Sequence, residues 1–486
     1  MEPDELVARL HGWDTGRGHP STRLSAALAA AIEDGRVPLG TRLPAERSLA
    51  SNLGVSRGTV VRAYASLRER DRAYTRQGSG TYAGRSDDRP GRSSQLAGML
   101  SAEGTGALTE RDAGAIDLRL ATRLGERDTL QAMRRWQPAD LTDVGLDDNG
   151  YWPLGLPALR HAIAARLTDH GLPTTPDQLI VTNGAQQALD LVLTTFATHQ
   201  DTVLIPEVTW PGLVELLAIR GLRPLTIPLA ADHQLDQVAL VGQLREGRSP
   251  LACLVPTFDN PTGAVMPGPT RRLVVEAARE GGTVLVDDLA LAELWLDDHP
   301  PPPLAAVVPG GAPHVVTVGS LSKLAWGGLR IGWLRAEAPL FDRLARVKTA
   351  LDLGNSVPSQ LAAVSVMRHL DDLVTAHRAE LRSRREAMTA ALTTHLPSWR
   401  FRPPAGGMSV WVDLGGVPGD SFANTAARYG VRLSPGRVYH ALGHDTGHVR
   451  LPLTHDIDTT NEAIRRLADA WADHLGQRRG RRIALV

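Results

Sequence analysis

From Ala115 onward, short apolar runs alternate with longer stretches in which apolar residues recur at helical spacing. Runs of this kind are typical of strands that are buried on both faces of a sheet. The alternation predicts an α/β fold, a sheet with helices on both faces, over residues 116–486. The predicted strands are LIVT, TVLIP, LACLVP, TVLVDD and HVVTVG, at residues 179–182, 202–206, 251–256, 283–288 and 314–319.

Two further regions precede this body. Residues 1–84 have short helical patterns that end in a glycine-rich turn, and residues 85–115 are polar, rich in Gly and Ser, and without a sustained apolar period. Such a composition is typical of a flexible linker. The chain has 486 residues, enough for about three average domains, so we expect an N-terminal domain, a linker and a large α/β body.

The composition narrows the classes of protein to consider. Basic and acidic residues number 53 each, which excludes a uniformly basic nucleic-acid coat but not a local basic patch. Cys253 is the single cysteine, so neither an intramolecular disulfide nor a cysteine-cluster metal site is expected. No apolar run approaches the ~18 residues of a membrane span, and the acidic N-terminus lacks the apolar segment of a secretory signal. We therefore expect a cytoplasmic protein without a membrane partner.

The stretch RLPAERSLASNLGVSRGTVVRAYASL, at residues 42–67, has the pattern of a helix-turn-helix. Gly54 is suited to end the first helix, and Ser56 is suited to cap the second. Arg57 and Arg62 lie on the side of the second helix opposite its apolar residues. This exposed, basic, N-terminal face is the part of such a module that enters a major groove.

The same segment resembles the GntR-type winged helix-turn-helix over about 60 residues. The matching motifs are Leu-Pro-Ala-Glu-Arg at 43–47, Leu-Gly-Val-Ser-Arg at 53–57, Thr-Val at 59–60 and the wing Gly-Ser-Gly-Thr-Tyr at 78–82. The resemblance implies double-stranded operator DNA as a partner. The expected DNA-binding residues are Arg47, Ser56, Arg57, Thr59 and Arg62, with minor-groove contacts from wing glycines such as Gly80. Val61 stands where some family members have a base-reading arginine. A helical protein-interaction module is the alternative.

Only two of the 53 basic residues are lysines, Lys323 and Lys348. A lysine can lose its proton and form an imine with an aldehyde, whereas a guanidinium stays charged. Lys323 follows Ser320 and Ser322 and precedes Arg330, and this set of hydroxyls with a fixed cation suits a phosphate beside an aldehyde. Pyridoxal 5′-phosphate (PLP) carries both groups, so we predict PLP as the cofactor.

Other motifs supply what PLP needs. TVLVDD ends in Asp287 and Asp288, and a carboxylate there would keep the pyridine nitrogen protonated; the expected strand register favours Asp287. VTNGAQQ places Gly184, Ala185 and Gln186 at a helix start, where backbone N–H groups bind anions.

Two more motifs complete the set. DNPTG provides Asn260, which can hydrogen-bond the phenolic oxygen of the ring, and PEVTWPG provides Trp210, which can stack on it. Each motif alone has a structural alternative, namely a Pro-Gly loop, a core tryptophan or an ordinary α/β crossover. Their order and spacing along one chain favour the joint interpretation.

Together these motifs make residues 116–486 resemble the fold-type I aminotransferase family. The resemblance implies that Lys323 is the Schiff-base lysine and Asp287 the pyridine partner. It also implies that Tyr151 reaches the phosphate bound by a second subunit and that Arg450 pairs with an α-carboxylate. Lys348 matches no motif and is expected at the surface. The implied ring and phosphate ligands are Asn260, Trp210, Gly184, Ala185, Gln186, Ser320 and Arg330.

One departure from that family concerns catalysis. Its members usually have a tyrosine two or three residues after the pyridine-binding Asp, where this chain has Leu289 and Ala290. Loss of that hydroxyl donor should raise the pKa of the internal imine. We therefore expect PLP binding to survive, while efficient transamination becomes doubtful.

A GntR-type domain joined by a linker to an aminotransferase-like body resembles the MocR/GabR family of bacterial transcription regulators, over essentially the whole chain. The resemblance implies a head-to-tail homodimer with PLP sites at the subunit interface, and an amine, an amino acid or PLP itself as effector. The leading hypothesis is a PLP-dependent regulator that is not an enzyme. The alternatives are a catalytically active aminotransferase and a regulator that has lost its cofactor.

Overall fold

The computed structural model describes residues 3–10, 13–14, 19–33, 36–37, 41–69, 72–76, 80–84, 114–122, 127–135, 149–230 and 232–483. The predicted linker at 85–115 lies almost entirely outside these residues, so the predicted domain boundaries stay predictions. Within the described part of the chain, no helix combines the length and the apolar character needed to cross a membrane.

The N-terminal domain has a hydrophobic core of its own. Val60, Tyr64 and Leu67, on one face of the second helix of the motif, are buried in this core as predicted. The described residues thus form the predicted helix-turn-helix followed by a hairpin. Its elements are α1 (Pro3–Arg9), α2 (Pro20–Glu33), α3 (Glu46–Leu53), α4 (Arg57–Glu69), β1 (Ala73–Arg76) and β2 (Gly80–Ala83).

The body is built on a seven-stranded sheet in the order β4-β10-β9-β8-β7-β5-β6. The five predicted strands are confirmed, while β6 at one edge and β10, which is antiparallel to both neighbours, were missed. Strands β5 to β9 are parallel wherever they pair with one another. The bounds are β4 (Leu179–Thr182), β5 (Thr202–Pro206), β6 (Arg223–Ile227), β7 (Leu251–Leu254), β8 (Val284–Asp288), β9 (Val315–Ser320) and β10 (Gly332–Arg335).

Helices cover both faces of this sheet, as predicted, because successive strand residues point to opposite sides. Leu285 of β8 packs in one core and Val286 in the other. The Leu285 core includes residues of α9 (Pro157–Asp169), α12 (Gln237–Glu246) and α13 (Gly268–Gly281). The Val286 core includes residues of α10 (Ala185–Phe196), α11 (Pro211–Arg220) and α14 (Ala338–Asp352).

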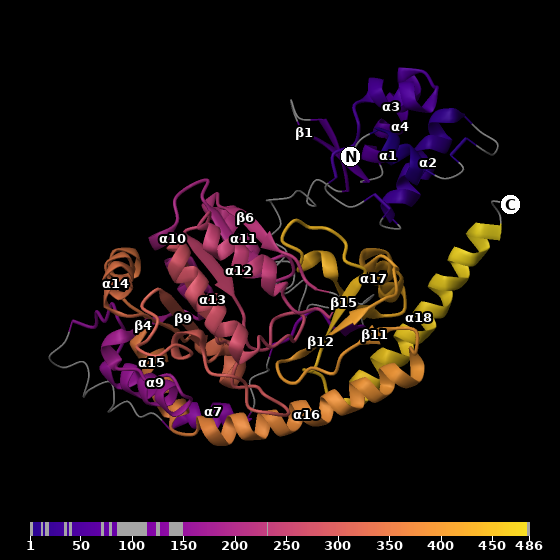
Figure 1. Ribbon diagram of the computed structural model, residues 1–486. Helices are drawn as coiled ribbons and strands as arrows, with labels where there is room; N and C mark the ends of the chain where they lie inside the picture. The colour runs from indigo at the N-terminus through magenta and orange to yellow at the C-terminus, as the bar shows by residue number, and fades with distance from the viewer. Residues whose placement is uncertain are drawn as a thin grey trace.

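A smaller sheet lies at the end of the body opposite to β4 and α9 (Figure 1). Its strand order is β11-β12-β15-β14. The long helix α16 runs from the region of α7 and α15 to this sheet, where α17 and α18 pack (Figure 1). The bounds are α7 (Arg127–Arg134), α15 (Val357–Met367), α16 (Leu370–His395), β11 (Arg400–Phe401), β12 (Ser409–Asp413), α17 (Gly419–Arg428), β14 (Ser434–Pro435), β15 (His448–Pro452) and α18 (Ile457–Ile483). A short parallel pair, β3 (Ile116–Asp117) and β13 (Val431–Arg432), joins the start of the body to this end.

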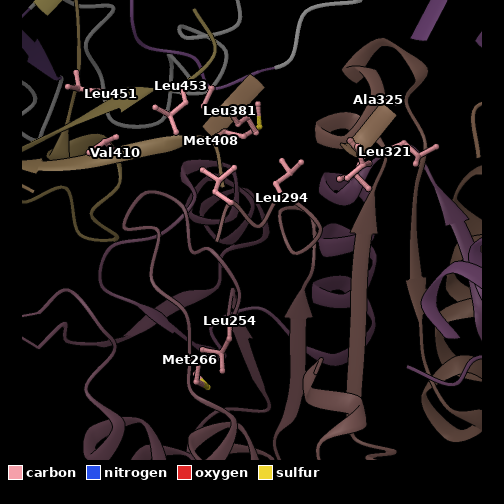
Figure 2. Packing of buried hydrophobic residues seen from close by; sticks show 14 of the residues in the cluster. Leu254, Met266, Leu294, Leu321, Ala325, Leu381, Met408, Val410, Leu451 and Leu453 are labelled. Carbon is pink, nitrogen blue, oxygen red and sulfur yellow. The ribbon is translucent and has the colours of Figure 1, made fainter. Parts of the chain in front are cut away.

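One core connects the two sheets. Leu321 and Ala325, on either side of Lys323, belong to the same buried cluster as Val410 of β12 and Leu451 of β15 (Figure 2). Leu294, Leu381 and Met408 lie between these two groups in the same view. Because interiors are closely packed, this cluster holds the lysine-bearing turn and the small sheet in a defined relation.

Candidate functional site

The start of α4 carries two of the predicted DNA-contacting residues. The Ser56 hydroxyl accepts a hydrogen bond from the Thr59 N–H at 3.2 Å, so Ser56 caps α4 as predicted. The Thr59 side chain is buried and its hydroxyl lies 2.9 Å from that of Ser56. Thr59 is therefore engaged in the helix start, and the DNA contact that the resemblance implied for it stays a prediction.

The predicted arginines lie at the surface of the same motif. Arg47, Arg57 and Arg62 are all exposed. Arg57 donates to the Glu46 carboxylate at 3.1 Å, and the two side chains are 59% and 32% exposed. An ion pair this exposed contributes little to stability, so Arg57 can exchange Glu46 for a phosphate at low cost.

The wing packs against an arginine that no sequence motif indicated. Gly80 has φ +109, and a Cβ there would lie 3.2 Å from Nε of Arg42. Arg42 also forms a β-bridge with Tyr82, which places its side chain against the wing. The signal for Arg42 is tertiary, because Arg42 lies before α3 and meets the wing only through the β-bridge with Tyr82. The other wing residues, 77–79, lie outside the described residues.

Lys323 lies in the turn after β9 and is half-buried. Its Nζ donates a hydrogen bond to the Ala121 carbonyl at 2.7 Å. The pKa of Lys323 is lowered to about 8, first by burial and then by the nearby Arg450, while Asp288 acts in the opposite direction. The chain thus holds an amine with a lowered pKa beside a carboxylate and a guanidinium. The contact with the Ala121 carbonyl could not be predicted, because every residue has a backbone carbonyl and the sequence does not mark one of them.

The expected choice between the two aspartates was wrong. Asp287 points to the α13 side of the sheet, where its Oδ2 accepts from the Leu304 N–H at 2.7 Å and its charge faces the buried Arg271. Asp288 points to the opposite face and interacts electrostatically with Lys323. Burial raises the pKa of each aspartate to about 6. Alternation along β8 decides this orientation, and it makes Asp288 the acid of the lysine site.

Trp210 lies on the same face as Asp288. The two residues line one small cavity together with Thr209 and Leu189 of α10. The Trp210 indole N–H donates to Oε1 of Gln186 at 3.2 Å, which ties the ring to the start of α10. An aromatic plane, a carboxylate and a helix N-terminus therefore meet at the carboxyl ends of the strands, where ligands of α/β sheets bind.

The helix start predicted to bind phosphate is present. Gly184 is the N-cap of the twelve-residue helix α10, with φ 82. Its own N–H donates to the Thr182 carbonyl at 2.9 Å, so the helix-start donors are Ala185 and Gln186. Arg330 donates through Nη2 to the Asn183 carbonyl at 2.6 Å and lies against Gly184.

Strand β10 lies between Ser320 of β9 and the end of β4, directly before the turn at Gly184. Gly332 pairs with Ser320 on one side and with Thr182 on the other. A Cβ on Gly332 would lie only 2.5 Å from the carbonyl carbon of Gly184, so glycine permits this approach. The Ser320 hydroxyl is 3.0 Å from that of Ser322. Hydroxyls, the helix start and Arg330 are thereby assembled, as the sequence predicted.

Arg450, whose charge acts on Lys323, is hydrogen-bonded to Asn260. Arg450 is 2% exposed and donates through Nη1 to Oδ1 of Asn260 at 3.3 Å and through Nη2 to the Arg119 carbonyl at 2.5 Å. Its guanidinium carbon lies 5.0 Å from the centre of the Tyr439 ring. Burial lowers the pKa of Arg450. Arg450 is therefore a buried cation and not a solvent-exposed surface charge.

The tyrosine hydroxyl expected after the pyridine-binding aspartate is also absent when that aspartate is Asp288. Counted from Asp288, the two positions of interest become Ala290 and Leu291 instead of Leu289 and Ala290, and none of the three has a hydroxyl. The Ala290 N–H donates to Oδ1 of Asp288 at 2.8 Å. Leu289 lines a cavity of about 400 Å³ together with Ser320, Trp333 and other residues.

Two remaining residues have contrasting environments. Tyr151 is 61% exposed, and its predicted reach to a second subunit stays a prediction. Lys348, expected at the surface, is instead 0% exposed and forms an ion pair with Asp352. The expectation failed because a single lysine without a motif looks the same in sequence whether its helix face is buried or exposed.

The residues around Lys323 fit PLP. Two buried polar atoms of the site have no hydrogen-bond partner among the described residues, Nε of Arg450 and Oγ1 of Thr209. Buried polar groups are rarely left unpaired, so both indicate a polar ligand. A lysine with a lowered pKa, an acid on the same face and an anion-binding helix start are the donor set that PLP requires.

Comparisons with known proteins agree with this site. Residues 125–467 match the family described as "Aminotransferase class I and II", and residues 20–83 match "Bacterial regulatory proteins, gntR family". The uncharacterized HTH-type transcriptional regulator YisV of Bacillus subtilis is 28% identical over 86% of this chain and 89% of its own. The HTH-type transcriptional regulator TauR of Rhodobacter capsulatus is 28% identical over 87% and 90%.

A solved structure gives the same result for the body. LysN, the α-aminoadipate aminotransferase of Thermus thermophilus, complexed with N-(5′-phosphopyridoxyl)-L-leucine, superposes with a TM-score of 0.68. The two proteins are 26% identical, and the match covers 77% of this chain and 98% of that one. The family and the donor set both indicate PLP as the cofactor. The chain belongs to the aminotransferase class I and II family, in the group of GntR-type, MocR-like transcription regulators that carry this fold behind a winged helix-turn-helix.

Proposed function

We propose that this protein regulates transcription by binding PLP at Lys323 and sensing an amine, an amino acid or PLP itself there. The observation that carries the proposal is Lys323 itself, whose pKa is lowered to about 8 beside Asp288 and Arg450, in a chain with a GntR-type DNA-binding domain. A lysine with a lowered pKa is more often deprotonated near neutral pH and condenses more readily with an aldehyde.

When bound, PLP supplies the aldehyde that Lys323 captures and a ring that withdraws electrons. In this proposal Asp288 holds the proton on the pyridine nitrogen, Trp210 covers one face of the ring and Asn260 donates to its phenolic oxygen. The phosphate ligands are Gly184, Ala185, Gln186, Ser320, Ser322 and Arg330, of which Gly184 acts by shaping the turn.

Arg450 is the proposed anchor for a carboxylate on the effector. Its two Nη groups already point at the Asn260 side chain and the Arg119 carbonyl, and its Nε has no partner among the described residues. A guanidinium fork suits a carboxylate because two parallel N–H donors meet its two oxygens. An effector carboxylate that binds here would replace hydrogen bonds to the neutral oxygens of Asn260 and Arg119 with an ion pair.

The proposed assembly is a head-to-tail homodimer whose DNA-binding domains contact paired half-sites of an operator. Tyr151 supports it, because a phenol that is 61% exposed is available to the phosphate of a second subunit. Effector binding acts as a switch only if it favours one arrangement of the DNA-binding domains over another. A coupling free energy of about 1–3 kcal/mol is typical of such switches.

Regulation rather than turnover is favoured by Ala290 and Leu291. Neither residue can donate to the phenolic oxygen, so proton transfers at the ring lose a supporting group. The retained Lys323, Asp288, Asn260 and Arg450 nevertheless leave an active aminotransferase as the second candidate.

The deciding experiment is borohydride reduction of the PLP-loaded protein followed by peptide mass mapping. We expect the reduced adduct on the peptide that contains Lys323, and no adduct and no visible absorbance band in Lys323→Ala. An intact band in Lys323→Ala would overturn the proposal. Adding single amines and amino acids to the wild type, with and without bound operator, then identifies the effector by its difference spectrum. Steady-state keto-acid formation at tens per second would instead support the aminotransferase.

A further inference from the structure

Lys348, near the end of α14, is the second of the two lysines and has no role in the site described above. Its Nζ donates to Oδ1 of Asp352 at 2.5 Å and to Oδ1 of Asn355 at 3.0 Å. The side chain is 0% exposed. Burial lowers the pKa of Lys348 and the Asp352 carboxylate opposes that shift. A buried ammonium is costly unless it is paired and hydrogen-bonded, and here it is both.

The partners of Lys348 close a ring of hydrogen bonds. Asn355 donates through Nδ2 to Oδ1 of Asn183 at 2.7 Å. The Asn183 N–H donates to Oε1 of Gln187 at 2.7 Å, and Gln187 donates through Nε2 to Oδ2 of Asp352 at 2.6 Å. The ring therefore runs from Lys348 through Asn355 to Asn183 and Gln187 at the start of α10, and returns through Asp352.

Asn183 is the residue directly before Gly184. Its carbonyl accepts the hydrogen bond from Arg330 at 2.6 Å, so side chain, N–H and carbonyl of Asn183 are all engaged. We propose that Lys348 is a positioning residue for phosphate: through Asp352 and Asn355 it holds the turn at Asn183, and with it the helix start that faces the anion. The inference rests on the proposed function for the identity of the phosphate as that of PLP.

The same ring is anchored to the segment that carries Tyr151. Gly354 has φ +130, and a Cβ there would lie 2.5 Å from the Trp152 carbonyl oxygen. The turn after α14 thus packs directly on the residue next to Tyr151. The Asn355 carbonyl also accepts from Nε2 of the buried Gln360 at 3.0 Å. A compact ammonium suits this place, since a planar guanidinium would bring five donors to two acceptors.

The test compares ligands that differ only in the phosphate. Lys348→Met removes the ammonium at similar length, and Lys348→Met/Asp352→Asn also removes the carboxylate that would be left unpaired. PLP and pyridoxal, which lacks the phosphate, are each titrated against wild type and both variants by absorbance. Arg466→Met is the control for loss of an i,i+4 ion pair far from the turn, because Arg466 pairs with Glu462 on α18.

We expect both Lys348 variants to bind PLP about 10- to 100-fold more weakly, by analogy with residues that orient the ligands of a metal ion. Pyridoxal binding should stay within about twofold, and Arg466→Met should behave as wild type. An unchanged PLP affinity overturns the inference. An equal loss for pyridoxal also overturns it, because Lys348 would then support the fold and not the phosphate site.

Inorganic phosphate separates this inference from the proposed function. It should raise the melting temperature of the wild type more than that of the double variant. Equal shifts in the two proteins overturn the role of Lys348. A shift lost in the variant supports it even if no adduct is found on Lys323, a result that would defeat the proposed function alone.

Discussion

The two functional regions of this molecule use charge in opposite ways. In the N-terminal domain the predicted DNA-contacting arginines are exposed. Arg57 forms an ion pair with Glu46 while 59% of the Arg57 side chain stays accessible. In the body the functional charges are buried or half-buried, and burial is the largest cause of the pKa shifts of Lys323, Asp288 and Arg450. Exposed charges are screened by salt and contribute separately, whereas buried charges depend on one another.

Replacement of the two aspartates should produce the largest contrast. Asp288→Asn should weaken PLP binding by about 2–5 kcal/mol, the usual cost of removing one partner of a buried charge pair, and alter its visible spectrum. Asp287→Asn should leave both the PLP affinity and the visible spectrum unchanged. Both variants should fold, because burial already raises each pKa to about 6 and a neutral side chain is therefore tolerated. If Asp287→Asn altered the visible spectrum and Asp288→Asn did not, Asp287 would again be the pyridine partner.

Arg450→Ala tests the buried cation on the effector side. If the effector carries a carboxylate, its affinity should fall by about 1.5–3 kcal/mol, the range for hydrogen bonds to charged groups. Effector titrations of the PLP-loaded protein measure this. If PLP itself is the effector, the response of operator binding to PLP should change little. The two results distinguish an amino acid sensor from a PLP sensor.

Arg57→Ala should have a smaller and salt-dependent effect. Operator binding should weaken, and the slope of log affinity against log salt should fall by about 1, as expected for loss of one phosphate contact. The PLP spectrum should not change. Arg245→Ala is the matched control, because Arg245 also forms an exposed pair, with Glu280 at 2.9 Å, but lies in the body. Equal operator affinity of Arg57→Ala and wild type would contradict the assigned role.

The pH dependence of PLP capture should be the mildest effect. The pKa of Lys323 is lowered from 10.5 to about 8, so the deprotonated fraction rises through pH 8 instead of through pH 10.5. The rate of PLP capture by the apo protein should therefore increase from pH 7 and level off about one unit above 8. A rate that keeps rising beyond pH 10 would indicate an ordinary, exposed lysine.

The two largest errors of the sequence-based interpretation concern orientation. TVLVDD predicted a strand with an acid at its end, and β8 is that strand. Which of two adjacent aspartates faces Lys323 depends on which side of the sheet α10 and α11 cover, and the motif alone does not specify it. Lys348 was likewise expected at the surface, because its burial depends on a turn after α14 and on α10, which is far away in sequence.

Local sequence determined the elements and the chemistry of this protein: the helix-turn-helix with its Gly54 turn, five of the seven strands of the large sheet, and a lysine among serines and an arginine. Periodicity and turn chemistry act over a few residues, so they are readable there. Only the tertiary structure decided that the charge of Asp288 and not that of Asp287 acts on Lys323, that Arg450 lies against Asn260, and that Lys348 is tied to Asn183 through Asn355. These relations join segments far apart in the chain, and close packing around a twisted sheet sets them.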